Sequence, residues 1–234
     1  MTKFKSGYTI ELRERGEAMK KSVYSLVLMD DVVEAIDELA YSLHTNRSNL
    51  INQILAEKVA MVTPEQQLQR VFDQLSEYLK PYTHFQIQNQ AADHMYSIKS
   101  ALRYKYNPTI RYSVYLMQQE GQLKGQLRII SRTQSEVLYY YLDAFFKLWN
   151  YVENEWAKVT WEVEEGTKWL RTFRLEAFQK LTQENELASV LSRYIKALDD
   201  GLKIYFNELG QEETQYHLLK QHYKRYYEEQ GCFI

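Results

Sequence analysis

Hydrophobic and polar residues alternate along SVYSLVL, residues 22–28, and the alternation stops where a helical pattern begins. An isolated strand does not persist in water, because its backbone groups lack hydrogen-bonding partners. No second strand lies nearby in the sequence, so we expect this segment to pair with the same segment of a second copy of the chain. Tyr24, Leu26 and Leu28 occupy one side of the expected strand, and Val23, Ser25 and Val27 occupy the other.

Two short helices are predicted after this strand. The first is capped by Asp30 or Asp31, since Asp31 and Glu34 have the spacing of a capping box, and it ends near His44. The second begins after Asn46, which we expect to be its N-cap. Apolar residues recur at helical spacing in both helices: Val32, Ile36, Leu39, Ala40 and Leu43 in the first, and Leu50, Ile51, Ile54, Leu55 and Val59 in the second.

A third helix and then a sheet are expected beyond a boundary near residues 61–64. Thr63 and Pro64 are typical of a helix start, and the helix should run to about Leu79 with Leu68, Val71, Phe72, Leu75 and Leu79 facing inward. From residue 84 to 132 the period changes to two, which predicts an antiparallel meander over 96–106, 109–117 and 122–132. The segment 84–88 is a candidate fourth strand. The expected core positions are Ile98, Leu102, Tyr104 and Tyr106, then Ile110, Tyr112, Val114 and Leu116, then Leu123, Leu127 and Ile129.

The remainder of the chain is predicted to be helical. Residues 136–156 are apolar on most sides, which is typical of a central helix packed against the sheet. Amphipathic helices are expected over 161–181, 186–209 and 215–230, punctuated by Gly201 and Gly210. The pattern thus divides the chain into an N-terminal basic arm (1–21), a strand-helix-helix unit (22–62) and an α+β domain (63–234) with a meander of three or four strands and several long helices.

Composition narrows the class of protein. The 234 residues include 26% charged residues with a formal net charge of -2, which is typical of a soluble globular protein without a global attraction to nucleic acid. The single cysteine, Cys232, excludes an intrachain disulfide and a multi-cysteine zinc site. The N-terminus is charged where a signal peptide is apolar, and no apolar run reaches about 18 residues. We therefore expect a cytoplasmic protein without a membrane partner. Motifs of catalysis, metal binding or cofactor binding are not found, so we expect no enzyme.

The stretch SVYSLVLMDDVVEAIDELAYSLHTNRSNLINQILAEKV resembles the ribbon-helix-helix DNA-binding proteins, the Arc/MetJ-like class, over residues 20–61. The resemblance implies a homodimer whose paired strands enter the major groove of double-stranded DNA. The groove-facing residues would be Val23, Ser25 and Val27. The start of the second helix would hold a phosphate through Asn46, Arg47 and Ser48, and Lys20 and Lys21 would reach backbone phosphates.

Two features depart from that family. Its groove-facing positions are usually polar, because base edges are read by hydrogen bonds, whereas here Ser25 stands between two valines. His44 stands where the family commonly has glycine. One explanation is that recognition of the DNA sequence depends mainly on DNA shape and the basic arm. The other is that the unit serves only for dimerisation.

The predicted meander has a second basic surface. Its cations face away from the expected core and are accompanied by one acid, Glu120. One interpretation is a solvated face balanced by acids of neighbouring segments, namely Glu153, Glu155, Glu162, Glu164 and Glu165. The other is contact with nucleic acid or a phosphate-bearing ligand, with Tyr104, Tyr106, Tyr112 and Tyr115 available for stacking. The cations are Lys99, Arg103, Lys105, Arg111, Lys124, Arg128 and Arg132.

These observations favour a bacterial-type transcriptional regulator, most simply a repressor, with a C-terminal domain that regulates, oligomerises or binds a protein or small-molecule effector. Two alternatives stay open. One is a dimeric interaction or scaffold protein that uses the unit only for dimerisation. The other is a nucleic-acid-binding accessory protein of a mobile element that acts through the basic sheet.

Overall fold

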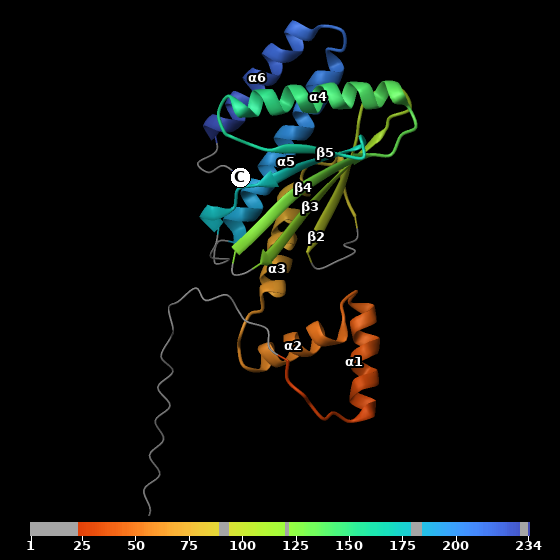
Figure 1. Ribbon diagram of the computed structural model, residues 1–234, viewed down its shortest axis with the longest axis vertical. Helices are drawn as coiled ribbons and strands as arrows, with labels where there is room; N and C mark the ends of the chain where they lie inside the picture. Colours follow the sequence, from red (N-terminus) through yellow and green to blue (C-terminus); the bar gives the residue numbers. More distant parts are fainter. Residues whose placement is uncertain (1–22, 89–93, 120–121, 179–183, 230–233) are drawn as a thin grey trace, which may run out of the picture.

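The computed structural model describes residues 23–88, 94–119, 122–178, 184–229 and 234, so the predicted basic arm (1–21) and Cys232 lie outside the described residues. Within them the chain has an α+β fold of six α-helices and a six-stranded antiparallel sheet (Figure 1). The helices are α1 (Asp30–Ser42), α2 (Arg47–Lys58), α3 (Pro64–Leu79), α4 (Glu136–Asn154), α5 (Glu184–Asn207) and α6 (Glu212–Glu229). The strands are β1 (Phe85–Ile87), β2 (Met95–Ala101), β3 (Thr109–Gln119), β4 (Gln122–Ser131), β5 (Trp161–Glu164) and β6 (Lys168–Phe173).

The two N-terminal helices are confirmed, but the predicted cap of α1 is wrong. Met29 is its N-cap and makes no side-chain cap bond, while Asp30 and Asp31 lie in the first turn, where their charge favours the positive end of the helix dipole. Helix α1 ends at Ser42, and His44 has a φ of 54°, the left-handed conformation that glycine adopts most easily. The predicted cap of α2 is confirmed, because the Asn46 side chain accepts a hydrogen bond from the Asn49 N–H at 2.9 Å.

Residues 23–29 precede α1 without a strand partner among the described residues of the chain. Their side chains are exposed, and Met29 has extended backbone angles. Pairing with a second copy stays a prediction.

Helix α3 begins as predicted. The Thr63 hydroxyl accepts a hydrogen bond from the Gln66 N–H, the Gln66 side chain accepts one from the Thr63 N–H, and Pro64 occupies the first turn. Each of its five predicted inward residues is buried. This capped helix opens the C-terminal domain and places its apolar stripe on the sheet.

The predicted meander is confirmed and extended. The strand order is β1-β2-β3-β4-β6-β5, and the candidate fourth strand is β1. The core positions expected on β3 and β4 are buried. The first strand is shorter than predicted: β2 ends at Ala101, and residues 102–108 form a turn in which Tyr106 and Asn107 have positive φ. Tyr106 is consequently fully exposed, not part of the core.

The helix predicted over 161–181 is wrong. Residues 161–173 form a hairpin, β5 and β6, which adds two strands beyond β4. Its turn contains Glu165 and Gly166, with φ values of 54° and 66°, and two consecutive positive values are typical of the tight hairpin turns that match strand twist. The alternation in WEVE and KWLRTF carries this period-two signal.

Helices α3 to α6 gather on one face of the sheet around a single core. Helix α4 is confirmed and contacts the added strands, with the rings of Phe146 and Trp169 stacked at 4.6 Å. The helix with the most buried residues among those described is α5. Gly201 does not punctuate α5 but lies inside it, against the Trp149 ring. Figure 1 shows α1 and α2 beyond the start of α3, at the end of the molecule opposite α4 and α6. None of the described helices combines the length and apolar character needed to cross a bilayer.

Candidate nucleic-acid interfaces

The residues predicted to face the DNA groove are solvent-exposed in one copy of the chain. Val23 and Val27 are 100% and 102% exposed, and Ser25 between them is also exposed. The predicted phosphate contacts Lys20 and Lys21 lie outside the described residues. The three predicted groove-facing residues are therefore available for contact. They would share one side of a strand only if residues 22–28 pair with a second copy.

The start of α2 brings together the other predicted phosphate contacts. Asn46 caps the helix, Arg47 is its first residue, and the exposed Ser48 follows. The Arg47 Nε donates to Asp37 Oδ1 at 2.6 Å, and a second guanidinium nitrogen bonds Asp37 Oδ2. The hydrogen bond from Arg47 lowers the pKa of Asp37. Arg47 thus ties α2 to α1, which the sequence pattern did not reveal, and both partners are about half exposed.

The sheet has one open face among the described residues. Side chains on β2, β3 and β4 alternate between the core and this second face, which no described helix covers. Four of the predicted basic residues lie on it, and the strand register places Lys99 directly opposite Arg111, and Arg128 opposite Ser113. The four are Lys99, Arg111, Lys124 and Arg128.

The remaining members of the predicted basic surface lie elsewhere. Arg103 and Lys105 are exposed in the turn after β2, because that strand ends before them, and Arg132 is exposed after β4. Of the four tyrosines considered for stacking, Tyr115 lies on the open face, with the Arg128 guanidinium 5.2 Å from its ring centre. Tyr112 is wrong as a stacking candidate, because it is buried and donates a hydrogen bond to Asp199 at 2.9 Å.

The acids expected to balance this surface are mostly engaged elsewhere. Glu153 is buried, with Arg171 Nε 3.3 Å from its Oε1, and Glu155 bonds Lys220 at 2.6 Å. Glu164 does approach Arg128, at 3.8 Å. No described acid pairs with Lys99 or Arg111, so the solvated-face interpretation accounts for only part of the positive charge.

A buried carboxylate joins the sheet to α5 on the opposite face. Asp199 accepts hydrogen bonds from Tyr112 at 2.9 Å, Ser100 at 3.1 Å and Lys203 at 2.6 Å. His84 Nε2 lies 3.3 Å from the same carboxylate. Burial, followed by the nearby Lys203 charge, lowers the pKa of His84, whereas burial and Asp199 raise the pKa of Tyr112. Sequence reasoning missed this cluster because its members are far apart along the chain.

His84, Asp199 and Asp200 are close enough to be candidate ligands of a metal ion, with ligand atoms within 4.8 Å of one another. Two ammonium groups already neutralise the carboxylates, since Lys203 contacts Asp199 and Lys196 contacts Asp200. The arrangement is better explained as an ion-paired support for α5 than as a cation site.

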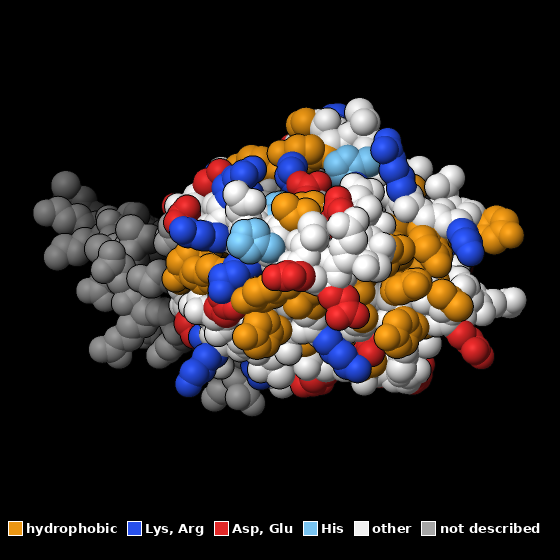
Figure 2. All heavy atoms as spheres, turned by 90° about the horizontal axis from the view of Figure 1, so that it is seen from above, with side chains coloured by type: hydrophobic (Ala, Val, Ile, Leu, Met, Phe, Trp, Pro, Cys, Tyr) orange, Lys and Arg blue, Asp and Glu red, His pale blue; other side chains and the backbone are white. Residues whose placement is uncertain are grey.

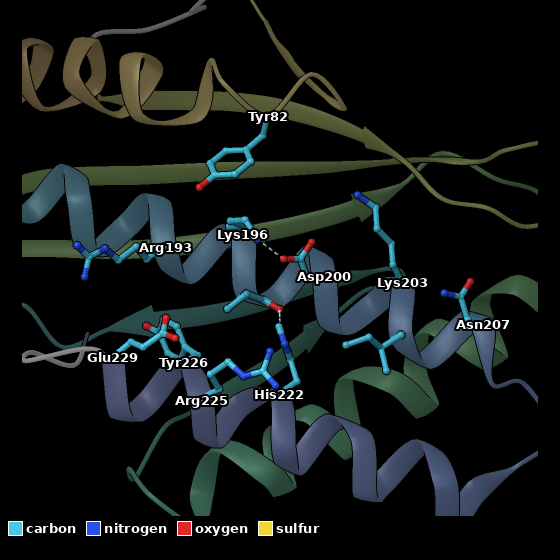
Figure 3. A pocket seen from close by; sticks show the side chains of 12 residues that line it. Tyr82, Arg193, Lys196, Asp200, Lys203, Asn207, His222, Arg225, Tyr226 and Glu229 are labelled. Carbon is cyan, nitrogen blue, oxygen red and sulfur yellow. Dashed lines mark hydrogen bonds and ion pairs between the residues drawn. The ribbon is translucent and has the colours of Figure 1, made fainter.

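Beside this cluster, α5 and α6 enclose a cleft of about 660 Å³ under Tyr82 (Figure 3). His222 Nε2 lies 2.8 Å from the Ala197 carbonyl and so fixes α6 against α5. The volume suits a small molecule, but the lining mixes cations with Asp200 and Glu229. The view over α4 and α6 likewise shows cationic and acidic side chains interspersed (Figure 2). Neither surface has a single sign of charge that would select a ligand.

Comparisons of the chain with protein-family models, with curated proteins and with solved structures find no match. The functional argument therefore depends on the residues and geometry described above.

Proposed function

We propose that the protein is a dimeric DNA-binding regulator of transcription, most simply a repressor that occupies an operator. In this proposal residues 22–28 of two copies pair antiparallel, and the resulting ribbon enters the major groove of double-stranded DNA. The observation that carries the proposal is the exposed apolar surface of residues 23–59 in one copy of the chain.

This surface is too extensive for a folded unit that acts alone. Within α1 and α2 only Ala40 and Leu50 are buried, while Leu39 and Leu55 of these helices and the C-cap Leu43 are about half exposed. Tyr24, Leu26 and Leu28 add 82%, 60% and 40% exposed side chains ahead of the helices. A unit of about 40 residues rarely buries enough apolar area by itself. A second copy would cover both the strand and the helices, and it would also satisfy the strand's backbone groups.

The DNA contacts in this proposal are mainly electrostatic. The amides at the start of α2 favour an anion, and Arg47 beside them adds a charge. Its ion pair with Asp37 is exposed, and exposed pairs of this kind are readily exchanged for other partners. Lys20 and Lys21 would add phosphate contacts outside the groove. Val23, Ser25 and Val27 offer little hydrogen bonding to bases, so we expect modest sequence preference and strong salt dependence.

A direct test measures binding of the full-length protein to genomic fragments at two salt concentrations. We expect at least one preferred fragment at low salt and a steep loss of affinity at high salt. Arg47→Glu should abolish retention, whereas Lys58→Glu, the same charge change at the other end of α2, should have little effect. If no fragment is preferred, or if both variants bind equally, the regulator proposal is wrong.

The second candidate is an interaction protein that uses the unit only to dimerise, and the apolar pair Val23 and Val27 favours it. Leu26→Arg should sediment as a monomer under either candidate, so this variant tests dimerisation independently of DNA binding. A wild-type dimer without DNA retention would favour the interaction protein.

A further inference from the structure

The open face of the sheet carries a pair of like charges that the described residues do not neutralise. Lys99 and Arg111 are directly opposed on β2 and β3, and their neighbours in the same row are Gln86 and Ile130. Like charges directly opposite on adjacent strands are destabilising. An anion that binds between them would remove this repulsion.

A hollow of about 510 Å³ is lined in part by Arg111, and Lys99 lies opposite Arg111 on β2, outside that lining. Its lining includes Ser97 and Ser113, each 4% exposed, whose hydroxyl oxygens lie 3.2 Å apart. One hydrogen bond between two hydroxyls uses one of their two hydrogens, so the second hydrogen can be donated to a ligand. The rest of the lining consists of Tyr115, Met95, Ile130, Ile87, Gln88 and Arg111.

The lining combines three kinds of chemistry within one small site. An aromatic ring and two apolar side chains suit the flat face of a base, and sequence-independent stacking on aromatic residues is common in single-strand binding. The serine hydroxyls suit polar atoms on the edge of a base. The guanidinium of Arg111, with the ammonium of Lys99 opposite, suits a phosphate.

We propose that this hollow binds a nucleoside phosphate, with the base over Ser97 and Ser113 and the phosphate on Arg111 and Lys99. The same chemistry is available in a free mononucleotide and in an unpaired nucleotide of a single strand. The site is distinct from the proposed duplex interface at residues 20–48, so the two can be tested separately.

The experiment measures binding of the full-length protein to a fluorescein-labelled oligothymidylate of about twelve nucleotides, a length typical of single-strand sites. Free thymidine monophosphate and adenosine monophosphate are measured by calorimetry. Lys99→Gln/Arg111→Gln removes the charge pair, and Ser113→Val fills the hollow without any change in charge. Arg70→Gln/Lys80→Gln is the matched control, because it removes two exposed cations, one in α3 and one at its C-cap.

We expect both the charge variant and Ser113→Val to weaken binding at least tenfold, while the α3 control and Arg47→Glu retain it. Binding of a free mononucleotide would identify a small-molecule ligand, and binding of the oligonucleotide alone would identify a single strand; either result supports the site. The proposal is overturned if neither probe binds, if the α3 control loses as much affinity as the charge variant, or if Ser113→Val binds like the wild type. The last result would indicate general attraction to the basic surface without use of the hollow.

Discussion

Gly201 is a position at which tertiary packing overrides helix propensity. It lies in the interior of α5, where alanine would normally be preferred. An added Cβ would lie 2.3 Å from a carbon of the Trp149 ring, closer than real contacts allow. The Trp149 ring therefore occupies the space that a side chain at position 201 would need. Glycine is required at this position for α4 to approach α5.

The two effects predict opposite signs for Gly201→Ala. Helix propensity alone would raise the free energy of unfolding by about 1 kcal/mol, whereas overpacking would lower it by about 1–3 kcal/mol. We expect the loss, measured by urea denaturation. In a Trp149→Phe background, which shortens the ring, the same substitution should cost less. A stabilised Gly201→Ala variant would contradict the packing.

His84, which lies beside Asp199, makes the free energy of unfolding depend on pH. Burial and the Lys203 charge lower its pKa, and they outweigh the attraction of Asp199 and Asp200. The unfolded state, with an ordinary histidine pKa of about 6.5, then takes up the proton first as the pH falls. Stability from this residue is present above pH about 6.5 and is lost at lower pH.

We therefore expect the His84 ring to titrate below pH about 6.5 in NMR spectra of the folded protein. His84→Asn should reduce the loss of urea resistance between neutral and mildly acidic pH. The effect should be small, because 35% of the side chain is exposed. A titration midpoint above the ordinary value would mean that the carboxylates dominate this site.

At the scale of elements, local signals predicted most of the fold. Thr63 and Pro64 predicted the start of α3, and the alternation in β3 and β4 identified their buried faces. The main error was the helix predicted over 161–181. The period of two in Trp161–Phe173 extends over only two short strands, and the charged residues of this segment resemble those of an amphipathic helix.

The candidate sites were predictable only in part, for the same reason. Lys99 and Arg111 were identified by alternation along their strands, but their direct opposition requires the register of β2 with β3. Arg103 and Lys105 were misplaced because nothing in the pattern shows that β2 stops at Ala101. The Asp199 cluster joins residues about a hundred positions apart, and no local signal identifies such contacts.

Gly166 provides a test of the β5–β6 hairpin. Its φ is 66°, and an added Cβ would meet no atom within 4 Å, so Gly166→Ala tests backbone conformation alone. We expect a loss of about 1–2 kcal/mol in the free energy of unfolding, and a smaller loss for Gly166→Asn, since asparagine tolerates this conformation. If this segment were the helix that the charge pattern indicated, alanine would stabilise it instead.

At the scale of the whole molecule, the core divides the chain into two unequal parts. The main hydrophobic cluster extends from Leu68 to Ile234 and includes neither Ala40 nor Leu50, the two buried apolar residues of α1 and α2. The C-terminal domain thus has a core of its own, while the N-terminal unit exposes most of its apolar residues. Association of two copies is expected to depend on the N-terminal unit.

This division predicts the behaviour of a fragment that begins at residue 63. We expect it to fold cooperatively, with a free energy of unfolding in the ordinary range of about 5–15 kcal/mol, because Thr63 retains the cap of α3. It should sediment as a monomer at micromolar concentration, whereas we expect the full-length chain to sediment as a dimer. It should also retain mononucleotide or single-strand binding while it loses duplex binding. A fragment that dimerises as strongly as the full chain would move the dimer interface to the C-terminal domain, with the open sheet face as its first candidate, and would remove the main argument for a paired ribbon.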